Sequence, residues 1–200
     1  MKRLIITMML TLAGVCLLGA QEVESPKQPE SRYEYEPIRS GDQYIRLGLG
    51  VNFPLFFTGP GGVETDTKLD MGGAGFIGFS RFITSHLSLG GELGFAFNAT
   101  LGENMLVYVP LTFKITYELV YDRLHFPLSL SPGLGLQSYK SRNYFGLLLR
   151  PEVACFFQYS PEWSFGVSSA WDILPQWYDT SSDNRVGHFV NVVVGLRYHF

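Results

Sequence analysis

From Asp42 to Phe200, apolar residues alternate with small or polar residues at a period of two. A β-strand points successive side chains to opposite faces, so this period predicts strands rather than helices. The alternation falls into eight segments of roughly ten residues, long enough to cross a bilayer when tilted. The segments cover residues 45–55, 69–79, 87–98, 107–117, 124–137, 145–157, 163–173 and 190–200.

The two faces of these segments differ in a way that selects the fold. One face is Leu, Val, Ile and Phe along its height, and the other is mostly Gly, Ser, Ala and Thr. Small side chains suit the narrow lumen of an eight-stranded barrel, and the apolar face suits lipid. The sequence therefore predicts an all-β fold, an eight-stranded antiparallel up-and-down transmembrane β-barrel over residues 42–200. A secreted soluble β-barrel, with its apolar face inside, is the alternative.

Connector lengths and aromatic residues agree with a membrane barrel. Connectors near residues 84–85, 121–122 and 160–161 are short, whereas 57–68 and 175–186 are long and 100–104 and 138–143 are intermediate. Outer-membrane barrels have short periplasmic turns and longer outer loops, which predicts periplasmic termini. Aromatic residues gather near both ends of the segments, which favours two interfacial girdles over ordinary strand aromatics.

The first 41 residues have a different character. Residues 1–20 combine a basic start, a 15-residue apolar run and the small pair Gly19-Ala20, which predicts a signal peptide. A lipoprotein cleaved before Cys16 is the alternative. Residues 21–41 carry three prolines and mixed charges with little apolar pattern, which predicts a disordered periplasmic tether.

Composition narrows the function classes. The 200-residue chain is 16% charged and 46% hydrophobic, against about 25% charged in an average globular protein. Cleavage after Ala20 leaves 13 basic and 18 acidic residues, a net charge of −5, with no basic block. That balance argues against a nucleic-acid partner. Cys155 would be the one remaining thiol, so no intrachain disulfide is expected.

The C-terminus resembles a known signal. In Leu196-Arg197-Tyr198-His199-Phe200, apolar or aromatic residues alternate and the last is Phe. Leu196, Tyr198 and Phe200 thus resemble the assembly signal that the outer-membrane barrel-insertion machinery reads. The opening at residues 41–48 resembles the start of OmpW barrels, and residues 108–114 resemble small barrels of spirochaetes.

Taken over residues 42–200, the chain resembles the small eight-stranded outer-membrane barrels of the OmpW, OmpX and OmpA-barrel types. The resemblance implies a bacterial outer-membrane location, with membrane lipid and the insertion machinery as partners. The OmpW type implies passive passage of small, including hydrophobic, molecules.

Charged residues on the small-residue face are candidates for a site in the lumen. Charges buried in a narrow lumen must pair with one another or reach water. They would form either a salt-bridged plug that closes the barrel or a narrow, gated path. The candidates are Arg46, Asp70, Glu92, Lys114, Arg150, Glu152, Asp172 and Arg197.

Two hypotheses for function follow. The first is passive passage of small, including hydrophobic, solutes through a narrow or gated lumen, with aromatic residues at the mouth. The second is a structural or surface-contact, adhesin-like barrel with a closed lumen, acting through residues 59–62 and 179–185. The mouth candidates, which rim anchoring would also explain, are Phe53, Phe56, Phe57, Trp171, Trp177 and Tyr178.

Catalysis is not expected. Ser129 and Ser131 share the lumen face with His125, but no Asp is placed beside them to complete a nucleophile and base. HxH, CxxC and HExxH spacings do not occur in the sequence. We therefore expect no enzyme activity, no metal and no cofactor.

Overall fold

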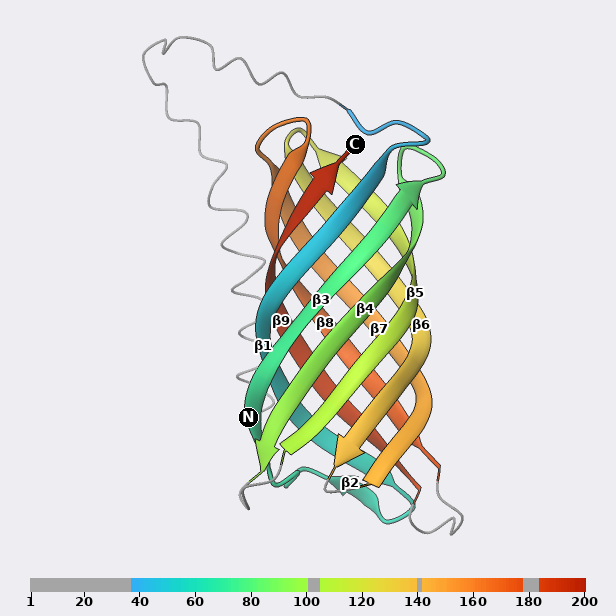
Figure 1. Cartoon of the computed structure of the whole chain (residues 1–200), viewed down its shortest axis with the longest axis vertical. Helices are drawn as coiled ribbons and strands as arrows, with labels where there is room; N and C mark the ends of the chain where they lie inside the picture. Colours follow the sequence, from blue (N-terminus) through green and yellow to red (C-terminus); the bar gives the residue numbers. More distant parts are fainter. Residues whose placement is uncertain (1–36, 101–104, 140–141, 178–183) are drawn as a thin grey trace, which may run out of the picture. The chain divides into compact units, whose positions relative to one another are not determined.

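The computed structural model describes residues 37–100, 105–139, 142–177 and 184–200 (Figure 1). The predicted signal peptide, most of the predicted tether and Tyr178 lie outside these ranges. At the described end of the tether, the Ser40 hydroxyl donates to the Ile83 carbonyl at 2.8 Å, and the Gly41 amide donates to Phe82 at 2.8 Å. Residues Ser40 and Gly41, at the end of the predicted tether, are therefore bonded to the barrel.

One antiparallel sheet curls into a closed barrel. Its order is β2-β1-β3-β4-β5-β6-β7-β8-β9, and an additional β1–β9 pairing closes it. The eight long strands confirm the predicted barrel, while the three-residue β2 pairs with the end of β1. The strands are β1 (Gln43–Gly59), β2 (Gly62–Glu64), β3 (Leu69–Phe82), β4 (Leu87–Thr100), β5 (Met105–Tyr121), β6 (Leu124–Tyr139), β7 (Arg142–Gln158), β8 (Trp163–Gln176) and β9 (Arg185–His199).

The barrel has two unlike ends, seen at the top and bottom of Figure 1. At the turn end, residues 83–86, 122–123 and 159–162 join neighbouring strands, and β1 begins beside the end of β9. Asp122 takes a positive φ of 52° in its two-residue turn, a conformation that Asp tolerates. The loop end carries the β1–β2 hairpin and the longer connections.

Several strands run further toward the loop end than the alternation predicts. β1 continues to Gly59 and β8 to Gln176, because pairs such as Thr58↔Val186 and Gln176↔Arg185 still satisfy the backbone. Backbone pairing does not require an apolar side chain. The alternating apolar pattern therefore indicates the part of each strand that faces lipid and not the full length of the strand.

The outward and inward faces match the membrane prediction. Leu49, Leu111 and Val194 point outward with more than half of their surface exposed, whereas the small and polar residues between them are buried. A soluble barrel would bury the apolar face, so that alternative is wrong. In the described part of the chain, we find no helix of sufficient length and hydropathy to cross a bilayer.

Candidate functional site: the barrel lumen

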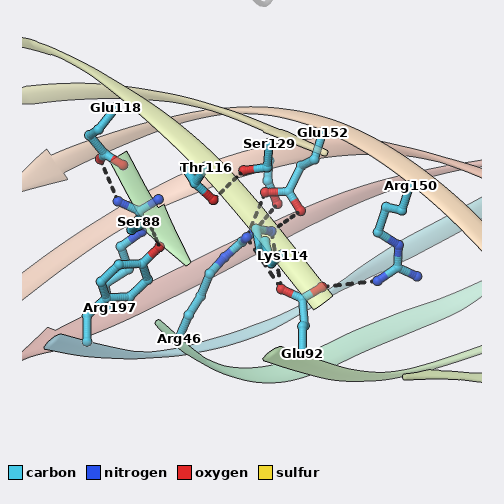
Figure 2. Close-up of polar contacts among 12 residues, drawn as sticks. Arg46, Ser88, Glu92, Lys114, Thr116, Glu118, Ser129, Arg150, Glu152 and Arg197 are labelled. Carbon is cyan, nitrogen blue, oxygen red and sulfur yellow. Dashed lines mark hydrogen bonds and ion pairs between the residues drawn. The ribbon is translucent and has the colours of Figure 1, made fainter. Parts of the chain in front are cut away.

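An ionic network crosses the lumen at mid-height (Figure 2). It joins Arg46 of β1, Glu92 of β4, Lys114 of β5 and Glu152 of β7, each at most 4% exposed. Arg46 Nη1 lies 2.6 Å from Glu152 Oε1 and 3.5 Å from Glu92 Oε2. Lys114 Nζ lies 2.8 Å from Glu152 Oε2 and 3.3 Å from Glu92 Oε2. Each cation therefore touches both carboxylates, and the four residues bridge opposite walls of the barrel.

Arg150 extends this network toward the loop end. Its Nη1 lies 3.1 Å from Glu92 Oε1, while its Nε and Nη2 donate to the two Asp172 oxygens at 2.5 and 2.9 Å. Such a two-point arginine–carboxylate pair fixes geometry as well as charge. Asp172 also accepts from the Tyr108 hydroxyl at 2.8 Å and from Asn191 Nδ2 at 2.7 Å.

On the loop-end side of Asp172, two buried asparagines join neighbouring strands of the wall. Asn52 Nδ2 donates to Asn98 Oδ1 at 2.6 Å. Asn98 Nδ2 in turn donates to the backbone carbonyls of Asn52 at 3.2 Å and Asp70 at 2.9 Å. The β1–β3 register ends at Asn52↔Gly72, so this side chain ties the two strands where their ladder stops.

The lumen becomes apolar toward the loop end. Leu106, Leu148, Leu174 and Phe189 are buried together on the loop-end side of Tyr108, and Phe57 packs edge-on against Phe189 at 6.2 Å between ring centroids. Beside this layer, Gln176 donates to Gln137, and Arg185 Nε donates to Gln176 Oε1 at 2.6 Å. The loop-end apolar layer, meaning these four residues with Phe57, closes the lumen without charge.

The turn end has its own buried pair, Glu118 and Arg197. Arg197 Nη1 lies 2.6 Å from Glu118 Oε1, and the guanidinium stacks 4.1 Å from the Phe156 ring centroid. His125 Nδ1 lies 3.3 Å from the same Glu118 oxygen. Glu118 is not among the charges predicted for the lumen. The alternation in β5 nevertheless places it on the same face as Lys114, four residues further along the strand.

The lumen contains seven of the eight predicted charges. Arg46, Glu92, Lys114, Arg150, Glu152, Asp172 and Arg197 are all buried there. The placement of Asp70 was wrong: it is exposed at the loop end, because a register shift between Leu69 and Gly72 interrupts the alternation at the start of β3. When Glu118 is counted instead of Asp70, the charges buried in the lumen are four cations and four carboxylates.

The predicted mouth aromatics divide between the two faces. A register shift between Pro54 and Phe56 in β1 turns Phe57 inward. It leaves Phe56 outside, stacked on His188 at 4.4 Å, with Trp171 5.7 Å from the same imidazole. Phe53 pairs with outward-facing Val190, and Trp177 is exposed after β8. Only Phe57 of the described candidates faces the lumen, so a mouth lined by the whole set is wrong.

Large side chains fill the space that small residues leave. A Cβ on Gly48 would collide with the Phe76 ring, which lies 4.1 Å from the Arg46 guanidinium. A cavity of about 10 Å³ beside Arg150, Glu152 and Asn191 has room for roughly one water. Asn191 Oδ1 has no hydrogen-bond partner among the described residues, so a water there would complete the network.

Of the three residues considered for catalysis, His125 and Ser129 contact other side chains, whereas Ser131 Oγ is buried without a hydrogen-bond partner among the described residues. His125 Nε2 pairs with Gln158 Oε1 at 3.1 Å, and Ser129 pairs with the Thr116 hydroxyl at 2.9 Å. Within the described ranges, no group of three or more metal-ligating side chains occurs. The arrangement can fix strand register and block the lumen.

Comparisons with known proteins agree with this architecture. The model of one protein family matches residues 22–198. An "Uncharacterized protein" of Treponema pallidum (strain Nichols) is 33% identical over 192 residues, which cover 91% of this chain and 88% of the relative. The sequence similarity thus extends over nearly the full length of both chains.

Two solved structures are similar in fold. Neisserial surface protein A (NspA) superposes with a TM-score of 0.63 at 11% identity, covering 80% of this chain and 100% of that chain. The outer membrane protein OprG from Pseudomonas aeruginosa gives a TM-score of 0.56 at 10% identity, covering 82% and 97%. The predicted resemblance to small outer-membrane barrels is confirmed for the fold.

Proposed function

The chain belongs to the family of the Treponema pallidum relative, and we propose that it is an outer-membrane barrel with a closed resting lumen. It acts as a structural or surface-contact protein rather than as an open pore. The observation that carries this proposal is the continuous side-chain filling of the lumen, from Glu118 through Glu92 and Asp172 to Leu174.

The proposed orientation places the turn end in the periplasm and the loop end outside the cell. Short turns at one end and longer connections at the other support it. The β1–β2 hairpin then projects outward, with Pro60 and Gly61 at its tip and Val63 and Glu64 exposed on β2. Exposed segments on a rigid barrel are the usual place for contacts with partners.

Electrical recording in planar bilayers tests the closed lumen. The wild-type protein should insert without stable single-channel steps, because ions cannot pass the buried ionic network. A variant that removes both layers is the positive control and should conduct. In it, Arg46, Glu92, Lys114, Arg150 and Glu152 of the ionic network and Leu106, Leu148 and Leu174 of the loop-end apolar layer are all replaced by Ala. Frequent large steps from the wild type would contradict the proposal.

A surface role is tested separately at the hairpin. Replacing residues 60–64 by a short turn removes β2 but leaves the eight long strands and Phe57. Cells carrying this variant should lose adherence to the surfaces that wild-type cells bind, whereas cells carrying the volume-conserving Leu174→Met, which changes the lumen alone, should keep it. Equal adherence of all three would remove the contact role and leave a purely structural one.

Passage of small hydrophobic solutes is the second candidate, and the loop-end apolar layer favours it. A small apolar molecule would meet Phe57, over whose ring the Arg185 guanidinium lies at 5.1 Å, and Leu174 before the buried charges of Asp172 and Arg150. Uptake into liposomes that contain the barrel, compared with empty liposomes, tests it. Leu174→Glu places a carboxylate on the path and should abolish uptake, and uptake no faster than in empty liposomes would exclude passage.

A further inference from the structure

Aromatic rings form a continuous strip on the outer wall at the turn end. Ring contacts link Phe165 to Trp163 at 6.4 Å, Trp163 to Tyr198 at 4.9 Å and Tyr198 to Phe200 at 6.1 Å. Phe79 of β3 lies 6.4 Å from Phe200 and ends the chain of contacts. The turn-end aromatic strip therefore runs from β8 across the β9–β1 closure to β3, and it includes two residues of the predicted assembly signal.

Arg81 lies where this strip ends. It follows Phe79 by two positions in β3, so both side chains point outward, while Ser80 and Phe82 between and after them are buried. Arg81 is exposed, with Gln43 and Leu89 as its register neighbours. Its guanidinium makes no hydrogen bond or ion pair with the described residues. In the turn-end half of the described strands, no other charged side chain faces outward.

An outward-facing cation on a strand at this height points to a particular ligand. Aromatic residues of barrels gather at the boundary between hydrocarbon and headgroups, which places Arg81 at the level of lipid phosphates. An arginine can lay its stem on apolar surface and extend its guanidinium into the headgroup layer. The guanidinium can then bind phosphate through two parallel hydrogen bonds.

We propose that Arg81 and the neighbouring aromatic strip form a binding site for the phosphate of a membrane phospholipid. In the orientation proposed above, the lipid belongs to the periplasmic leaflet. The ring of Phe79 contacts the upper acyl chain, and the Arg81 guanidinium holds the phosphate. This site is independent of whether the lumen conducts.

Native mass spectrometry of the full barrel with phosphatidylglycerol tests the site. The wild type should retain one phosphatidylglycerol, and Arg81→Gln should bind it roughly tenfold more weakly, because one charge-assisted contact is lost. Arg81→Lys should show intermediate binding, since it keeps the charge without the two-point geometry. Lys68→Gln removes one exposed charge at the loop end and is the matched control, with unchanged binding.

Two results with the variants would overturn the proposal, and so would displacement of the lipid by free phosphate. One is equal phosphatidylglycerol binding by the wild type and Arg81→Gln. The other is an equal loss in Arg81→Gln and Lys68→Gln, which would show that total charge matters rather than this site. Inorganic phosphate added in excess should leave the bound lipid in place, and displacement of the lipid would mean that the guanidinium recognises free phosphate instead. Unchanged heat-dependent gel mobility shows that each variant is folded.

Discussion

The middle of the lumen and its loop end are equally buried, yet they are closed by opposite chemistries. At mid-height, Arg46, Glu92, Lys114 and Glu152 exclude water through ion pairs that each depend on several partners. At the loop end, Leu106, Leu148 and Leu174 exclude it through packing alone. A charged layer is closed only when its charges balance, whereas an apolar layer is closed whenever its volume is filled. The two regions should therefore fail differently when altered.

The largest effect is expected from Glu92→Ala. Arg46, Lys114 and Arg150 all contact Glu92, so its loss leaves three cations sharing Glu152 and Asp172. An unbalanced buried charge typically costs several kcal/mol, and we expect the free energy of unfolding to fall by about 4 kcal/mol. Urea unfolding in lipid vesicles measures it.

A second substitution separates charge balance from packing. Adding Lys114→Met to Glu92→Ala leaves the pairs Arg46–Glu152 and Arg150–Asp172 intact and the charges equal. The double variant should recover part of the lost stability, a coupling that a double-mutant cycle measures. If the stability losses of Glu92→Ala and Lys114→Met simply add in the double variant, charge balance does not determine the stability of the mid-height network.

A smaller effect is expected from Leu174→Ala in the apolar layer. Leu174 is 1% exposed, and truncating such a side chain leaves a cavity, so we expect a loss of about 3 kcal/mol in the same unfolding assay. Leu174→Met conserves volume and should cost less than about 1.5 kcal/mol. If Leu174→Met lowered the free energy of unfolding by much more than this, the layer would depend on the exact shape of the side chain and not only on its volume.

The smallest effect is expected at the asparagines between the two regions. Asn98→Ala leaves the carbonyls of Asn52 and Asp70 without this donor, and we expect a loss of about 2 kcal/mol. Hydrogen exchange should become faster at the amides of Gly72 and Gly73, next to the end of the β1–β3 ladder, and stay unchanged at Gly195 in the β1–β9 seam. If hydrogen exchange became equally faster at Gly195 and at Gly72 and Gly73, Asn98 would stabilise the whole barrel and not specifically the β1–β3 pairing.

Much of the fold could be predicted because alternation assigns each residue to a face. Lys114 and Arg150 were placed in the lumen on that basis, and the same rule would have found Glu118. Asp70 and Phe56 could not be placed, because each lies at a register shift where one strand gains a residue relative to its neighbour. Such a shift depends on the partner strand, which local alternation does not contain.

The sequence by itself determined the class of protein. The period of two, the apolar face and the short turns are local properties, and together they require a barrel that exposes its apolar face to lipid. Only the tertiary structure decided whether the charges in the lumen pair with one another. Glu92 meets Lys114 and Arg150 because strands distant in sequence converge at one height, and that height follows from how all the strands stagger around the barrel. Whether charges pair into a plug is thus a property of the closed barrel, not of any one strand.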